Sequence, residues 1–293
     1  MTNSISIILP ARNEARSLRT LLPEIRARMP NAEIIVVNDG SDDDTLAVCA
    51  AFPVRVVSHP YPKGNGAAVK SGARAANGDV LIFMDADGQH QPEDIPRLLE
   101  WFNEGYDMAV GARTSGSQAG VHRAVANDIF SRFASWMVQQ PVEDLTSGFR
   151  VVKADKFRKF LYLLPNGFSY PTTITMSFFR AGFSVAYLPI NTPRRATGKS
   201  HVRPVRDGVR FILIIIKIGT LYSPQKLFLP ISACFFLTGI GYYLYTYLSV
   251  GRFTNMSALL FISAIFTFLI GIVSEQISGL HYKDIDRTHD QGD

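Results

Sequence analysis

Two aspartates that directly follow a short apolar run are the residues of this chain best suited to chemistry. Residues 80–84 are all apolar, and Asp85 and Asp87 come next with one residue between them. On an extended backbone both side chains point the same way, so the carboxylates would lie together where a buried strand ends. Such a pair suits a hard divalent cation that also binds phosphate oxygens. The alternative is that Asp87 or Gln91 caps a helix opening at Pro92, with Asp85 in solvent.

The stretches around this pair alternate between strand and helix patterns. Regular alternation predicts an α/β fold with a mostly parallel sheet and helices on both faces. Ligands of such sheets bind beyond the carboxyl ends of the strands, and polar residues follow four of the predicted strands, at 10–14, 39–44, 85–91 and 111–113. We expect strands at 5–9, 33–37, 54–58, 80–84, 108–111 and 184–188, and helices at 14–28, 42–51, 66–76, 92–103, 123–139 and 172–181.

Other phosphate-binding and metal-binding motifs are missing from the chain. Gly64-Asn-Gly66 begins like a dinucleotide-binding fingerprint, but Val69 stands where its third glycine should be. The chain contains no Walker A sequence, no His-Glu-x-x-His and no Cys-x-x-Cys. These absences argue against redox, P-loop and zinc chemistry.

Two long uncharged runs near the end of the chain predict membrane spans. Residues 227–251 and 253–274 carry no charge, and as helices each could cross about 30 Å of hydrocarbon. Residues 205–222 have the pattern of a helix lying in the membrane interface. The expected domains are a cytoplasmic α/β domain over 1–203, an interfacial helix over 204–223, two transmembrane helices over 224–280 and a cytoplasmic tail over 281–293.

Composition and charge agree with a membrane protein of a reducing compartment. The 293 residues are 47% hydrophobic and only 19% charged. The net charge of +5 could suit nucleic acid, but basic residues gather just before the first apolar run, where they favour anionic lipid and a cytoplasmic orientation. Cys49 and Cys234 fall in different regions, so no disulfide framework is predicted. We expect a protein of the cytoplasmic membrane, with both termini cytoplasmic and no nucleic-acid partner.

Several motifs, taken in chain order, resemble a known enzyme family. Gly111-Ala-Arg113 and Ser147-Gly-Phe-Arg150, with the two apolar runs, resemble polyprenyl-phosphate glycosyltransferases such as dolichyl-phosphate mannose synthase and the bactoprenol glucosyltransferases. Residues 166–171 depart from the pattern of those enzymes. The motifs that resemble family 2 glycosyltransferases of the GT-A fold are Pro10-Ala-Arg-Asn-Glu14, Val37-Asn-Asp-Gly-Ser-Asp42, Lys63-Gly-Asn-Gly66 and Asp85-Ala-Asp-Gly-Gln-His90.

The resemblance implies roles for individual residues, grouped by ligand. The donor nucleotide would be bound by Pro10, Asn13, Glu14, Asp39, Lys63 and Asp85. A Mg²⁺ or Mn²⁺ ion would be held by Asp85, Asp87 and Gln89. The acceptor phosphate would meet Arg113, Arg123, Ser147, Arg195 and Lys199. The implied catalytic residues are Asp85, Asp87 and Arg113.

The implied reaction is an inverting, metal-dependent transfer of a sugar from a nucleotide diphosphate donor to polyprenyl phosphate, with UDP the favoured nucleotide. One alternative is a synthase of the dolichyl-phosphate mannose type that uses GDP-mannose. A processive polysaccharide synthase ranks lower, because its Gln-x-x-Arg-Trp motif is missing: neither Trp101 nor Trp136 follows an arginine. A third alternative is a membrane-tethered protein that binds nucleotide sugars without catalysis. The sugar and the oligomeric state stay open.

Overall fold

The computed structural model describes residues 4–113, 121–167, 169–191, 216–217 and 219–287. The chain divides into two compact units, Met1–Ser200 and His201–Asp293. Each unit is described by itself. The predicted site residues that lie in described segments all belong to the first unit.

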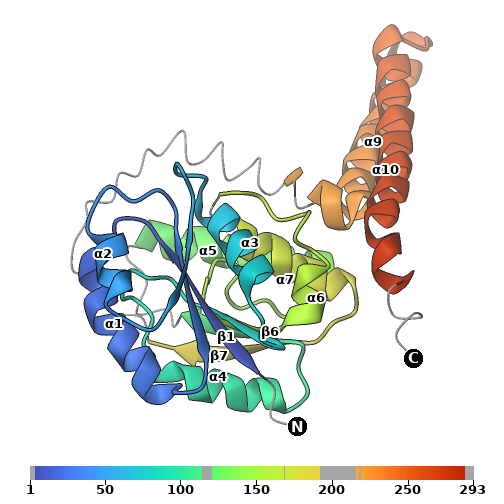
Figure 1. The fold of residues 1–293 in the computed structure, drawn as a ribbon. Coiled ribbons are helices and arrows are strands. Elements are labelled where there is room, and N and C mark those ends of the chain that lie inside the picture. The colour runs from blue at the N-terminus through green and yellow to red at the C-terminus, as the bar shows by residue number, and fades with distance from the viewer. Residues whose placement is uncertain (1–3, 114–120, 168, 192–215, 218, 288–293) are drawn as a thin grey trace. The chain divides into compact units, whose positions relative to one another are not determined.

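The first unit is built on a seven-stranded sheet with the strand order β3-β2-β1-β4-β6-β5-β7 (Figure 1). All neighbouring strands are parallel except β6, which is antiparallel to both β4 and β5. The mostly parallel sheet expected from the sequence is therefore confirmed. The strands are β1 (Ile5–Ala11), β2 (Glu33–Asn38), β3 (Arg55–Ser58), β4 (Val80–Phe83), β5 (Met108–Arg113), β6 (Arg150–Lys153) and β7 (Val185–Ile190).

Strand β6 is the main difference from the sequence expectation, which placed only a turn before it. The strand is four residues long and has a basic residue at each end, so it carries no clear alternation of apolar and polar residues. It becomes a strand because it pairs on both sides, with Phe83 and Val110 both opposite Arg150. Tertiary pairing therefore decides this segment rather than local propensity.

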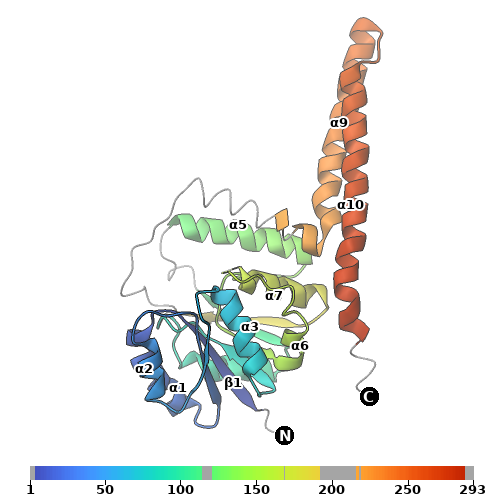
Figure 2. The same cartoon turned by 45° about the horizontal axis from the view of Figure 1, so that its top comes forward.

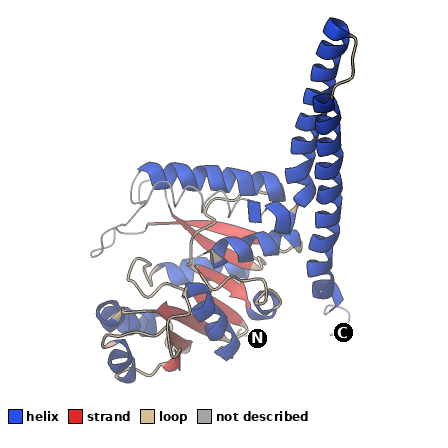
Figure 3. Cartoon of the chain, turned by 90° about the horizontal axis from the view of Figure 1, so that it is seen from above, coloured by secondary structure: helices blue, strands red, loops and turns tan. Residues whose placement is uncertain are grey.

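Helices cover both faces of the sheet, as Figure 3 shows by colouring strands red and helices blue. On one face, α1, α2 and α4 bury a shared apolar core with alternate strand residues such as Ile7 and Ile82. On the other, α3 packs on Ile8 and α6 sets Phe157 against Phe83 with ring centroids 4.5 Å apart. The helices are α1 (Ala15–Arg28), α2 (Thr45–Ala50), α3 (Asn65–Ala75), α4 (Asp94–Asn103), α5 (Val121–Val138), α6 (Ala154–Arg158) and α7 (Tyr170–Arg180).

Figure 2 shows α5 lying over α7, and the two helices are in contact. Helix α6 was not expected from the sequence, and its five residues are too few to show a helical period. The other helices of the first unit begin and end within about three residues of the expected positions, as is usual for boundaries read from sequence.

The second unit contains a hairpin of two long helices, α9 (Pro224–Val250) and α10 (Asn255–Arg287). The turn between them uses Gly251 at φ 69°, and the hydroxyl of Ser232 donates to the carbonyl of Ala264 at 2.8 Å. Pro224–Val250 and Asn255–Leu280 are long and apolar enough to cross a membrane, as the sequence predicted. Most of the predicted interfacial helix lies outside the described residues.

The buried carboxylate of Asp107, just before β5, links β6, α6 and the segment before β7. Asp107 accepts hydrogen bonds from the ammonium groups of Lys153 and Lys156, each at 2.7 Å, and from the backbone N–H of Ser184 at 3.0 Å. Burial alone would raise the pKa of Asp107, but these donors lower it to about 2. The ionised form of Asp107 is therefore more stable in the folded protein than in the unfolded chain.

We predict that Asp107→Asn lowers the free energy of unfolding by about 2 kcal/mol at pH 7. Because the folded-state pKa is depressed, this contribution is complete above about pH 4 and is lost as the pH falls toward 2. Urea unfolding of the detergent-solubilised protein between pH 7 and pH 3 checks the trend. The exposed Asp155, on α6, provides the control Asp155→Asn. A deficit that stays constant with pH would contradict the charge argument.

Candidate active site

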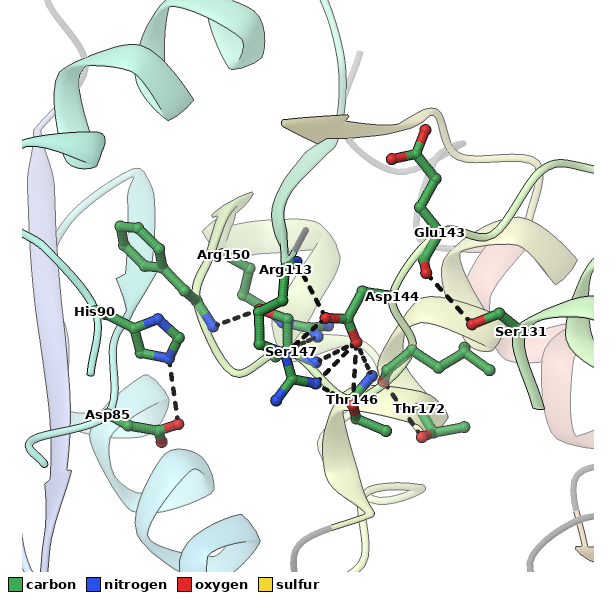
Figure 4. A network of polar contacts seen from close by, with 12 residues as sticks. Asp85, His90, Arg113, Ser131, Glu143, Asp144, Thr146, Ser147, Arg150 and Thr172 are labelled. Carbon is green, nitrogen blue, oxygen red and sulfur yellow. Dashed lines mark hydrogen bonds and ion pairs between the residues drawn. The ribbon is translucent and has the colours of Figure 1, made fainter. Parts of the chain in front are cut away.

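The two aspartates of the predicted metal motif lie directly beyond the carboxyl end of β4. Asp85 has a side chain that is 32% exposed, and Asp87 is half-buried. The backbone N–H of Gln89 donates to Asp87 at 3.0 Å, which closes a tight turn. Within the described segments, Asp85 has two nearby donors, His90 Nε2 and Asn65 Nδ2, each 3.5 Å from one carboxylate oxygen (Figure 4 shows His90).

The surroundings of Asp85 favour its ionised form. Burial alone would raise its pKa, but the hydrogen bond and charge of His90, the amide of Asn65 and the charge of Arg113 lower it on balance. His90 itself is buried and stacks on Phe149, with ring centroids 5.1 Å apart. The site therefore presents a fixed negative charge at the strand end.

The donor set suits a divalent cation that arrives with a phosphate ligand. Within the described residues, no three His, Cys, Asp or Glu side chains gather around one point, so a closed protein cage is not formed there. Two carboxylates and the amide oxygen of Gln89 are what the motif offers. Mg²⁺ is usually held by one or two carboxylates, with substrate phosphates and waters completing the shell. Asp85, Asp87 and Gln89 fit such a site.

Arg113 lies on the same edge of the sheet and is held by a carboxylate that the sequence did not single out. Its Nε and Nη2 atoms donate to the two oxygens of Asp144 at 2.8 and 3.1 Å, and Nη2 also donates to Thr146 (Figure 4). Burial alone would raise the pKa of Asp144, but the paired guanidinium lowers it. Asp144 also accepts the backbone N–H groups of Thr146 and Ser147. One buried carboxylate thus fixes both the guanidinium and the loop beside it.

The loop after Asp144 runs close against Asp85. A Cβ atom added to Gly148 would lie 2.8 Å from an Asp85 oxygen, so a larger residue there would displace the Asp85 carboxylate. Ser147 is 1% exposed, and its hydroxyl accepts the backbone N–H of Phe149 at 3.3 Å. Its contact with an acceptor phosphate stays a prediction.

Arg150, the first residue of β6, donates hydrogen bonds that position this loop. Its guanidinium is fully buried and donates to the carbonyls of Ser147 and Pro171 and to the hydroxyl of Thr175. No described carboxylate forms an ion pair with it. Arg150 therefore joins the loop to α7 through hydrogen bonds to neutral acceptors.

The loops that follow β1 and β2 are joined by hydrogen bonds at the neighbouring strand ends. Asn13, at φ 59°, donates its N–H to the Ser41 hydroxyl at 3.0 Å, and its side-chain oxygen accepts from Asp42 at 2.8 Å. The N–H of Glu14 donates to the hydroxyl of Thr45 at 3.1 Å. The predicted nucleotide residues at 10–14 thus lie against the loop that begins at Asp39.

Asp39 is 4% exposed, and its carboxylate accepts hydrogen bonds from protein groups. It accepts the backbone N–H groups of Lys63 and Gly64, each at 2.8 Å, and lies 2.7 Å from Nδ1 of His59. Gly66 packs so tightly on the segment 165–167 that an added Cβ would lie 2.1 Å from the Pro165 carbonyl oxygen. Asp39 therefore anchors the turn that precedes α3, and its contact with a nucleotide stays a prediction.

The structure brings most of the predicted residues to one edge of the sheet, although not all can be placed. Asn65 links the Lys63 turn to Asp85, and Asp144 links Arg113 to the Ser147 loop. The side chain of Arg123 and all of Arg195 and Lys199 lie outside the described residues. The residues that sequence reasoning missed are His59, Asn65, His90 and Asp144. Asn65 and His90 stood inside the family motifs without an assigned role, and Asp144 begins an Asp-x-Thr sequence that is typical of a turn.

The sequence matches two protein-family models and several glycosyltransferases. Residues 6–161 match the glycosyl transferase family 2, and residues 223–280 match the GtrB C-terminal hairpin. The polyprenol monophosphomannose synthase of Mycolicibacterium smegmatis is 28% identical over 214 residues, covering 68% of this chain and 81% of the relative. A dolichyl-phosphate hexose transferase of Haloferax volcanii is 28% identical over 220 residues, covering 74% of this chain and 94% of the relative.

The fold also matches a solved glycosyltransferase structure. Glucosyl-3-phosphoglycerate synthase from Mycobacterium tuberculosis, crystallised with Mn²⁺ and uridine-diphosphate-glucose, superposes with a TM-score of 0.58 at 24% identity, covering 74% of this chain and 78% of that one. This likeness supports the GT-A fold expected from the motifs. With its family match spanning more than half of its length, the chain belongs to glycosyl transferase family 2 and is a glycosyltransferase.

Proposed function

We propose that this glycosyltransferase moves a sugar from a nucleotide diphosphate donor onto a polyprenyl phosphate at the cytoplasmic face of a membrane. The observation that carries the proposal is the pairing, in one chain, of a family 2 domain with a hairpin matching the GtrB C-terminal hairpin. The names of the relatives, which include a dolichol-phosphate mannosyltransferase of Pyrococcus furiosus 40% identical over 115 residues, support a polyprenyl acceptor. That last relative matches over only 37% of this chain and 33% of its own.

The chemistry needs two anionic partners to meet in line without repulsion. The acceptor phosphate is already an anion at neutral pH, because its second pKa is about 6, so no strong general base is required. Asp144 holds the guanidinium of Arg113 through Nε and Nη2, whereas Nη1 makes no hydrogen bond with a described residue. That free edge suits a phosphate oxygen.

The donor side is assigned to the edge formed by the loops after β1, β2 and β4. Asp85, Asp87 and Gln89 would hold Mg²⁺ or Mn²⁺, and the bound ion would offset the charge that develops on the leaving diphosphate. The Lys63 turn and residues 10–14 would contact the nucleotide. UDP is favoured over GDP as the donor nucleotide, by resemblance to the bacterial enzymes.

The membrane arrangement follows from charge and span count. Two spans bring both termini to one side, and the basic residues ahead of the first span favour the cytoplasm. A catalytic domain over 1–203, an interfacial segment over 204–223, a span pair over 224–280 and a tail over 281–293 complete the proposal. A cytoplasmic catalytic domain would meet both a soluble nucleotide sugar and a lipid headgroup.

The direct test is transfer from a panel of UDP- and GDP-sugars to undecaprenyl phosphate in detergent, with lipid-linked product as the readout. We expect product from one donor, loss of product with EDTA and recovery with Mg²⁺ or Mn²⁺. Nucleotide-sugar binding without transfer from any donor would favour the non-catalytic alternative.

We predict that Asp87→Asn lowers the transfer rate at least about a hundredfold while the melting temperature stays near that of the wild type. The amide keeps the size of the side chain and removes the charge that would hold the metal. Transfer assays at increasing Mn²⁺ concentrations check this, with the exposed Asp155, outside the candidate site, as control in Asp155→Asn. Wild-type turnover by folded Asp87→Asn would remove Asp87 from the metal site.

We predict that Arg123→Ala raises the KM for polyprenyl phosphate about ten- to a hundredfold and leaves nucleotide affinity nearly unchanged. Lysine at this position should recover only part of the loss, since it cannot form a bidentate contact. Acceptor-dependent kinetics beside calorimetric titration of nucleotide provide the measurement. Arg132, exposed on the same helix, offers the matched control Arg132→Ala. Equal losses of nucleotide and acceptor would assign Arg123 to the donor side instead.

A further inference from the structure

A chain of three hydrogen-bonded side chains lies behind the Lys63 turn. Nδ1 of His59 is 2.7 Å from an oxygen of Asp39, and Nε2 of His59 is 2.8 Å from the hydroxyl of Ser71 on α3. We propose that His59 is a positioning residue for the donor nucleotide, because it orients the Asp39 carboxylate that holds the turn at Lys63 and Gly64. The inference rests on the proposed function, in which this turn lines the nucleotide pocket.

The ring of His59 is held in one orientation by its partners. It is 7% exposed, and its backbone N–H also donates to the carbonyl of Asn38 at 2.9 Å. An ionised carboxylate only accepts, so the proton of the ring lies on Nδ1, and a neutral ring then accepts the Ser71 hydroxyl at Nε2. A ring fixed at both nitrogens can direct a carboxylate as a freely rotating side chain could not.

The orientation of Asp39 matters because its two oxygens serve different backbone groups. The N–H of Lys63 donates to Oδ1, which also faces His59, and the N–H of Gly64 donates to Oδ2. Rotation about the Cβ–Cγ bond would break both backbone contacts together. Burial alone would raise the pKa of Asp39, but His59 and the two backbone donors lower it, so the anchor stays charged.

The anchored turn continues directly into the reaction centre. Gly64 has φ 102°, and an added Cβ there would lie 2.5 Å from the Asn166 carbonyl oxygen, so the turn is wedged between Asp39 and the segment 165–167. The next residue, Asn65, begins α3 and reaches to 3.5 Å from Asp85. A shift of the Asp39 carboxylate would therefore displace backbone at the candidate donor site.

The same three residues stand in the order of a Ser–His–Asp catalytic relay. A relay would make Ser71 the nucleophile, so that its loss would be as damaging as the loss of His59. A positioning role makes Ser71 secondary, because the bond that matters runs from Nδ1 to Asp39. Substitution of Ser71 therefore separates the two assignments.

Two amide substitutions of His59 separate the contributions of the two ring nitrogens, because each keeps one of the two hydrogen bonds. His59→Asn places an amide N–H where Nδ1–H lies and gives up the Ser71 contact. His59→Gln reaches toward Ser71 and gives up the Asp39 contact. We expect His59→Gln to raise the Kd for nucleotide diphosphate and the KM for the donor about ten- to a hundredfold, with the KM for polyprenyl phosphate within about twofold of wild type. His59→Asn should stay within about fivefold of wild type, and Ser71→Ala within about threefold.

The measurement is calorimetric titration of the full-length protein in detergent with UDP and with GDP, beside donor and acceptor kinetics and thermal unfolding of each variant. Nucleotide binding by His59→Gln at wild-type affinity would overturn the proposal. So would an Asn variant as impaired as the Gln variant, or a Ser71→Ala variant as impaired as either. A wild-type chain that binds nucleotide but gives no lipid-linked sugar contradicts the proposed reaction and leaves the role of His59 measurable by titration.

Discussion

The negative charge of Asp85 is the constraint around which the edge of the sheet is arranged. Its carboxylate lies at the end of a buried strand, where loss of solvent opposes ionisation. His90, Asn65 and the charge of Arg113 offset that cost, and each comes from a different segment. Gly148 lets a fourth segment approach within contact distance. Keeping one carboxylate charged thus depends on three segments together: the loop after β4, the start of α3 and the end of β5.

Two further aspartates organise the loops on either side of Asp85. Asp39 binds the backbone of the turn before α3, and Asp144 binds Arg113 and the backbone before Ser147. In both, a buried carboxylate accepts several donors, which is how such a group stays ionised out of water. Their effect is to hold backbone in fixed positions, and this makes a preorganised site possible on connecting segments.

The antiparallel strand β6 explains why the loop before Arg150, so far along the chain, reaches Asp85. Because β6 runs opposite to β4 and β5, its first residue, Arg150, pairs with Phe83 near the end of β4. The residues just before it therefore emerge at the carboxyl edge of the parallel strands, beside Asp85 and Arg113. A parallel strand in that place would have sent the same loop to the opposite edge. The reversal of one strand combines donor-side and acceptor-side candidates in one site.

The sequence by itself determined the fold class, the order of most elements and the identity of the charged groups at the strand ends. These follow from local patterns: apolar runs of strand length, helical periods, and polar residues where a parallel sheet must open to its ligand. Motif order was also enough for the family and for the candidate roles of Asp85, Asp87 and Arg113.

Only the tertiary structure decided which side chains serve one another. His59, His90 and Asp144 acquire their roles from contacts with Asp39, Asp85 and Arg113, across 20, 5 and 31 positions of the chain. Spacing of this kind follows no helical or strand period, so no sequence pattern announces it. Strand β6 was hidden for the same reason, since its pairing partners lie far away in the chain. Local propensity determines which segments become helices and strands. Pairing and packing between distant segments determine the geometry that keeps a buried carboxylate ionised.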